Sequence, residues 1–132
     1  MDMEVEFAIP GGLEAPMRAR HELRAHLEDG LEPELGRDLE LLLSEIVTNA
    51  VRHGDAGPGI PVDVRIEADD GHACVCVRDN GRGFEPLDHP QPHFDRRPGG
   101  FGLYLLDQLS TRWGVERDLA GTRVWFELDR GA

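Results

Sequence analysis

Hydrophobic residues between positions 39 and 53 recur at steps of three and four, which predicts a strongly amphipathic helix. The apolar members of this pattern are Leu39, Leu42, Leu43, Ile46, Val47, Ala50 and Val51. We expect the helix to run from about residue 34 to residue 52. The glycine- and proline-rich residues 54–61 then form a loop, because that composition does not continue a helix.

Elsewhere, alternation of apolar and polar residues predicts β-strands. We expect strands at residues 3–9, 62–68, 73–77, 113–118 and 122–128. The segment 73–77 is apolar on both faces, which favours a central position in the sheet. Two shorter helices are expected at residues 16–29 and 102–111. Without a repeat or a linker, the pattern predicts one α+β domain that spans residues 1–132.

Composition narrows the class of protein. The chain has 132 residues, 39% hydrophobic and 30% charged, with a formal net charge of −12, so nucleic acid and anionic membranes are not expected as direct partners. All 14 basic residues are arginine, which excludes a catalytic lysine within this chain. No apolar run is long enough for a transmembrane helix and no signal peptide is evident, so we expect a cytoplasmic protein.

The cysteines and two of the histidines do not point to a metal. Cys74 and Cys76 are two residues apart on a predicted strand, where neither a disulfide nor a zinc site is expected, and we expect them to pack in the core. His89 and His93 flank Pro90 and Pro92. These prolines rule out the helix that would bring the two imidazoles together.

Three patterns carry candidate chemistry. Glu45 and Asn49 lie one turn apart on the central helix, where a carboxamide oxygen suits Mg²⁺ and a carboxylate suits proton removal. Asp79-Asn80-Gly81-Arg82-Gly83 follows the apolar strand, where a carboxylate could accept a hydrogen bond from an amine such as that of adenine. Gly99-Gly100-Phe101-Gly102 opens a helix, where backbone N–H groups bind phosphate, although no P-loop lysine follows.

Each pattern alone has a plainer explanation: a solvated polar stripe, a glycine turn, and a loop–helix junction. In chain order, the three together resemble the GHKL ATPase superfamily with its Bergerat ATP-binding fold. Residues 41–53 match its N box, residues 77–84 its G1 box and residues 99–106 its G2 box. The resemblance covers residues 5–128. It implies a two-layer α/β sandwich, with a mixed sheet covered on one face by about three helices.

Within that superfamily the chain looks most like the small anti-sigma-factor serine/threonine kinases of bacteria. The form E-x-x-x-N-A-x-x-H at residues 45–53 and the form G-G-x-G-L at residues 99–103 are similar to theirs. No segment ahead of the domain could hold a phosphorylatable histidine helix pair. We therefore do not expect a complete histidine kinase.

The resemblance implies a role for each matching residue. Glu45 would orient or deprotonate the attacking hydroxyl, and Asn49 would coordinate Mg²⁺ at the ATP phosphates. Asp79 would hold the adenine amine, supported by Thr122. The remaining nucleotide-binding residues would be His53, Gly81, Gly83, Gly99, Gly100, Phe101, Gly102 and Leu103. Residues 85–98 would form the ATP lid. Arg96 or Arg97 could add positive charge there, the alternative being that both lie in a solvated loop.

The function implied is that of an ATP- and Mg²⁺-dependent serine/threonine protein kinase. It would phosphorylate a STAS-type anti-sigma-factor antagonist, sequester a sigma factor and form a homodimer. An alternative is an ATP-binding module that traps a protein partner without phosphorylating it, and a third possibility is simple ATP hydrolysis. The presence of Glu45 favours the kinase.

Overall fold

The computed structural model describes residues 3–26, 33–53, 60–69, 71–79, 101–118 and 121–130. Within this part of the chain, the side chains of residues 52, 53, 101–103, 117 and 118 are not described. The elements are β1 (Met3–Pro10), α1 (Ala15–His26), α2 (Pro33–His53), β2 (Pro61–Ala68), β3 (His72–Asp79), α3 (Phe101–Leu109), β4 (Arg112–Asp118) and β5 (Gly121–Asp129).

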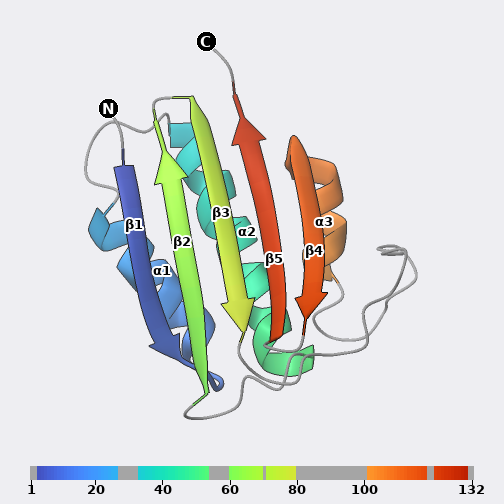
Figure 1. Ribbon diagram of the computed structural model, residues 1–132. Coiled ribbons are helices and arrows are strands. Elements are labelled where there is room, and N and C mark those ends of the chain that lie inside the picture. The colour runs from blue at the N-terminus through green and yellow to red at the C-terminus, as the bar shows by residue number, and fades with distance from the viewer. Residues whose placement is uncertain are drawn as a thin grey trace.

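The five strands form one sheet in the order β1-β2-β3-β5-β4. All neighbouring pairs in the described sheet are antiparallel, so the α+β class is confirmed, but the expectation of a mixed sheet is wrong. The reason is the place of β5. β3 and β4 point the same way, but β5 lies between them and runs opposite to both (Figure 1). No two parallel strands are therefore neighbours.

The helices α1, α2 and α3 cover one face of the sheet (Figure 1). The face beneath them collects every second residue of the strands, as the alternation predicts. In β3 the buried residues are Ala73, Val75, Val77 and Asp79. α2 packs against α1, α3 and β3, and its residues Leu39, Leu42, Leu43 and Val47 have no exposed surface. The core therefore lies in one layer between the sheet and α2.

Two expectations about local structure are corrected. Cys74 and Cys76 are not core residues, because they alternate with Val75 and lie half-exposed on the outer face of the sheet. The α3 helix ends at Leu109 rather than at residue 111. The Thr111 N–H donates to the Glu127 carbonyl of β5 at 2.8 Å instead of continuing the helix. No helix in the described residues is both long and apolar enough to cross a membrane.

Candidate nucleotide site

Three polar residues are buried together at one end of the core. Among the described residues, Asn49 is 8% exposed, Asp79 is 3% exposed and Thr122 is 2% exposed. They come from α2, β3 and β5, and all three line one cavity. Buried polar groups are costly unless they have partners, so this end of the core differs from the apolar remainder.

The sheet register brings Asp79 and Thr122 together. Asp79 is the last residue of β3, and it pairs across the antiparallel ladder with Thr122 near the start of β5. Gly121, the residue before Thr122, has a φ of 142°. Only glycine adopts that backbone conformation without strain, so the Gly121-Thr122 pattern has a physical reason as the entry to this strand.

The cavity between α2 and the strand ends has mostly apolar walls. Ile46 and Ala50 contribute from α2, Val77 from β3 and Val124 from β5. The volume is about 20 Å³, roughly that required by one water molecule. The sequence patterns did not single out these four residues as part of a site. Their positions could have been inferred, because Val77 and Val124 lie two residues from Asp79 and Thr122 on the same strand faces.

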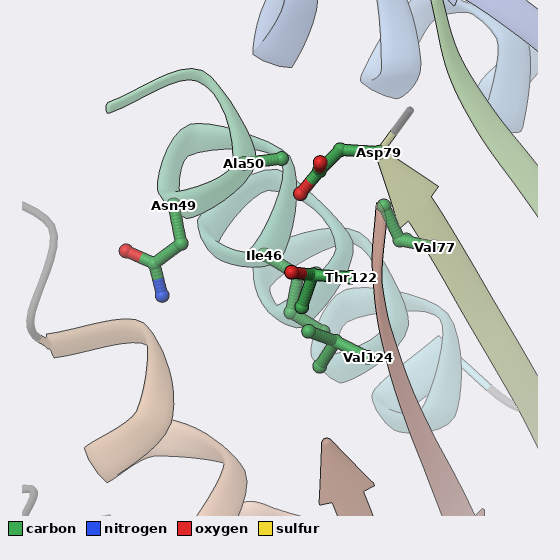
Figure 2. Close-up of a pocket in the computed structure, with 7 residues that line it drawn as sticks. All are labelled: Ile46, Asn49, Ala50, Val77, Asp79, Thr122 and Val124. Carbon is green, nitrogen blue, oxygen red and sulfur yellow. The ribbon is translucent and has the colours of Figure 1, made fainter. Parts of the chain in front are cut away.

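Figure 2 shows how the polar side chains are directed. The Asp79 carboxylate and the Thr122 hydroxyl point toward α2 near Ala50 and Ile46, whereas the Asn49 carboxamide points away from them (Figure 2). Glu45 lies one turn before Asn49 on α2 and is half-buried, but it does not line the cavity. The Asp79 carboxylate and the Asn49 carboxamide therefore border one cavity but point in different directions.

Two buried polar atoms of this cluster have no hydrogen-bond partner among the described residues. They are the Asn49 side-chain oxygen Oδ1 and the Thr122 hydroxyl oxygen Oγ1. A buried polar atom left unpaired costs about 1–3 kcal/mol. Such a cost is typical of sites where a ligand supplies the missing bond.

The other predicted site residues are placed less completely. Phe101, Gly102 and Leu103 form the first turn of α3, and His53 is the last residue of α2. Gly81, Gly83, Gly99 and Gly100, together with the expected lid at residues 85–98, lie outside the described residues. Across the described residues, no group of three or more His, Cys, Asp or Glu side chains could hold a metal ion.

The described residues form a two-layer α+β sandwich with a buried carboxylate at a strand end and a carboxamide on the covering helix. Comparison with known proteins identifies the class of domain to which this fold belongs. Residues 9–128 match the histidine kinase-like ATPase domain. The chain belongs to this family, and membership implies that it binds ATP.

Among curated proteins, the chain is 34% identical over 122 residues to the Anti-sigma F factor of Pasteuria penetrans, covering 83% of this chain and 80% of that protein. It is 26% identical over 93 residues to the Sensor protein kinase GraS of Staphylococcus aureus. That match covers 62% of this chain and 26% of the kinase, so the chain corresponds to about a quarter of that longer protein.

Solved structures show the same fold. The RsbU and RsbW domains of Rv1364c from Mycobacterium tuberculosis match with a TM-score of 0.63 and 26% identity, covering 97% of this chain and 34% of theirs. A blue-light activated histidine kinase of Erythrobacter litoralis matches with a TM-score of 0.59 and 23% identity, covering 86% of this chain and 40% of that one. This second likeness concerns the fold alone.

Proposed function

We propose that this protein is an ATP-dependent anti-sigma factor with serine/threonine protein kinase activity. It phosphorylates a STAS-type anti-sigma-factor antagonist and sequesters a sigma factor. The similarity to the Anti-sigma F factor of Pasteuria penetrans supports this proposal, because it extends over 80% of that protein. The similarity to the RsbU and RsbW domains agrees with it.

The observation that carries the proposal is the buried polar cluster of Asp79, Thr122 and Asn49, which line one cavity. Asp79, buried opposite Thr122, is suited to accept a hydrogen bond from the adenine amine, and the residues around it on α2, β3 and β5 are apolar. The Asn49 carboxamide points away from Asp79 and Thr122 (Figure 2). A nucleotide bound beside α2 would use both groups, with its base at Asp79 and its phosphates near Asn49.

Asn49 fits an Mg²⁺ ion. Its Oδ1 atom is buried and has no hydrogen-bond partner among the described residues, and a neutral amide oxygen is an ordinary ligand of hard cations. When bound, Mg²⁺ supplies positive charge that offsets the charge of the ATP phosphates. The chain's own contribution is to hold that oxygen on a rigid helix and to keep it out of bulk water.

Glu45 is the residue proposed to act on the substrate hydroxyl. It lies one turn before Asn49 on the same helix and is half-buried, so it remains partly open to an approaching protein. A carboxylate in that place can orient a serine hydroxyl and accept its proton. The first turn of α3, residues 101–103, would offer backbone N–H groups to the phosphates.

The test is a transfer assay with Mg²⁺ and γ-labelled ATP, run with each STAS-domain protein of the source genome. We expect label on one of them, and a loss of about 100-fold or more in the Glu45→Gln variant. Glu40→Gln is the matched control, because Glu40 lies on the same helix but pairs with Arg24 of α1. Binding of ATP without transfer to any candidate would support a trapping module instead, and no ATP binding would refute the proposal.

We also propose that the protein acts as a homodimer in the cytoplasm. The resemblance to the anti-sigma-factor kinases implies a homodimer, which would present two nucleotide sites to its partners. Light scattering at micromolar protein concentration should give about twice the mass of one chain, which is 14.7 kDa. A monomer under those conditions would contradict this part of the proposal.

A further inference from the structure

At the end of the core opposite the cavity, Arg130 joins the two helices that carry the candidate phosphate-binding groups. One of its guanidinium nitrogens, Nη2, lies 2.6 Å from a carboxylate oxygen of Asp38 on α2. The same nitrogen donates to the carbonyl of Leu109, the last residue of α3, at 3.1 Å. The two charged side chains are only 25% and 21% exposed, so water screens this pair less than it does an ordinary surface pair.

Arg130 is itself fixed to the sheet. Its backbone N–H donates to the Gly71 carbonyl at 2.8 Å, at the turn between β2 and β3. The residue before it, Asp129, donates its N–H to the Thr111 hydroxyl at 2.9 Å. One arginine therefore connects the sheet, the first half of α2 and the C-terminal end of α3.

Among the described side chains of α3, few others fix the helix to the rest of the domain; one is Asp107, which accepts a bond from the Trp113 indole N–H at 3.5 Å. It has nine residues, a length that is not stable as a helix without tertiary contacts. Leu106 is its one fully buried side chain among those described, and Leu105 and Leu109 are half-buried. A cation at the last carbonyl stabilises a helix end through the helix dipole. The bond from Arg130 to Leu109 is therefore one of the described contacts that hold α3 in place, together with the burial of Leu106.

The geometry of α2 connects this contact to the site. Asp38, Glu45 and Asn49 are spaced by seven and four residues, so they lie along one side of the helix. Asp38 contacts the C-terminal end of α3 through Arg130. The two helices pack together and run in opposite directions (Figure 1). The first turn of α3 therefore lies toward the part of α2 that bears Asn49.

We infer that Asp38 and Arg130 form a clamp that positions α3 for phosphate binding. The inference rests on the proposed function, since it assigns the clamp to the ATP site of that proposal. Nine residues make a helix about 12 Å long from first to last Cα. A tilt of roughly 10° at the clamped end would then move the first turn by about 2 Å. A displacement of about 1 Å at a reacting group can cost on the order of 100-fold in rate. Asp38 and Arg130 are thus positioning residues that touch no substrate.

The first test needs no nucleotide. Amide hydrogen exchange is measured in the apo protein for wild type, Asp38→Asn, Arg130→Gln and the control Arg24→Gln. Arg24→Gln removes another arginine–carboxylate pair of α2, with Glu40, on the side that faces α1. We expect exchange in α3 to rise about 10-fold in the two clamp variants, with no change in β3 and β5 and no change in the control. Unchanged exchange in α3 would overturn the clamp.

The second test compares ligands that differ in their phosphates. Adenosine would contact only the groups near Asp79, whereas the phosphates of ATP would also contact Asn49 and the first turn of α3. We expect the clamp variants to bind adenosine like the wild type, to bind ATP about 10-fold more weakly, and to transfer phosphate more slowly still. Arg130→Lys keeps the charge and should recover part of the loss. A merely structural role would lower the melting temperature but would leave the ratio of ATP to adenosine affinity unchanged, which would also overturn the inference.

The two tests separate the clamp from the proposed function. A wild-type protein that binds no ATP, but whose clamp variants exchange faster in α3, would refute the ATP site and would support the positioning of α3. A wild-type protein that binds ATP, and whose clamp variants bind and exchange as it does, would refute the clamp alone.

Discussion

The two ends of the layer between the sheet and its helices differ in whether their polar groups have hydrogen-bond partners. At the end near Arg130, polar groups are joined to one another: Arg130 to Asp38 and Leu109, and Asp129 to Thr111. At the end near Asp79, the Asn49 and Thr122 oxygens are buried without a hydrogen-bond partner among the described residues. The apolar core lies between these two ends.

This difference supports the proposal that the Asp79 end binds a ligand, while the Arg130 end stabilises the fold. Paired polar groups contribute about 0.5–1.5 kcal/mol each, while a buried unpaired one costs about 1–3 kcal/mol. A domain of this size has only about 5–15 kcal/mol of stability in total. Unpaired atoms concentrated at one end are therefore a substantial cost, and the proposed ligand would offset it.

The largest expected effect is at the binding end. Replacing Asp79 with Asn removes the carboxylate charge but keeps the shape of the side chain. We expect ATP affinity to fall about 10- to 100-fold, because hydrogen bonds to charged groups contribute about 1.5–3 kcal/mol. Isothermal titration calorimetry measures the loss. Asp63→Asn, on β2 next to β3, is the control because its side chain belongs to the other face of the sheet. Unchanged affinity in Asp79→Asn would show that the adenine does not bind at Asp79.

A smaller effect distinguishes the two ends directly, by the same substitution at each. Thr111→Val removes a hydroxyl that accepts a bond from the Asp129 N–H, so we expect a loss of about 1 kcal/mol in the free energy of unfolding. Thr122→Val removes an unpaired buried hydroxyl, so we expect the apo protein to gain about 1 kcal/mol while ATP affinity falls.

Urea denaturation without nucleotide measures both variants, and ATP titration measures the change in affinity. The contrast depends on changes of opposite sign in the free energy of unfolding for the two variants. If both variants lose stability equally, the Thr122 hydroxyl has a partner in solution, and the two ends do not differ in the way described.

The smallest effect concerns the outer face of the sheet. Burial raises the pKa of the Cys74 thiol, and the charges of Glu127, Glu67 and Cys76 raise it further, against the opposing effect of Arg123. A thiol whose pKa is raised has less thiolate at a given pH, so Cys74 should react with iodoacetamide more slowly than a free cysteine between pH 7 and 9.

Peptide mapping after alkylation follows the rate at each pH. Glu127→Gln should speed the reaction, because it removes a negative charge beside the thiol. The modification should leave ATP affinity unchanged, since Cys74 lies on the face of β3 opposite to Asp79. Loss of ATP binding on alkylation of Cys74 would mean that a change on the outer face of the sheet alters the nucleotide site.

Much of the fold follows from local patterns in the sequence. The steps of three and four residues around Leu42 and Ile46 predicted α2, and alternation predicted strands such as β1 and β2, because both signals come from the direction in which successive side chains point. The continuous apolar run at residues 73–77 predicted β3. The chemistry expected of Glu45, Asn49 and Asp79 also rests on residue type and spacing, which are local, and it stays a prediction. The family similarity confirmed the resemblance that those patterns suggested.

The tertiary structure decided what depends on pairing between distant segments. The β3 sequence is apolar on both sides, and only the packing of α2 on one face determined that Val75 is buried while Cys74 and Cys76 are half-exposed. The position of β5 between β3 and β4 made the sheet antiparallel and placed Thr122 opposite Asp79. The link from Arg130 to Asp38 joins residues 92 positions apart. Sequence periodicity cannot show such a contact, because it records only neighbours within a few turns of the chain.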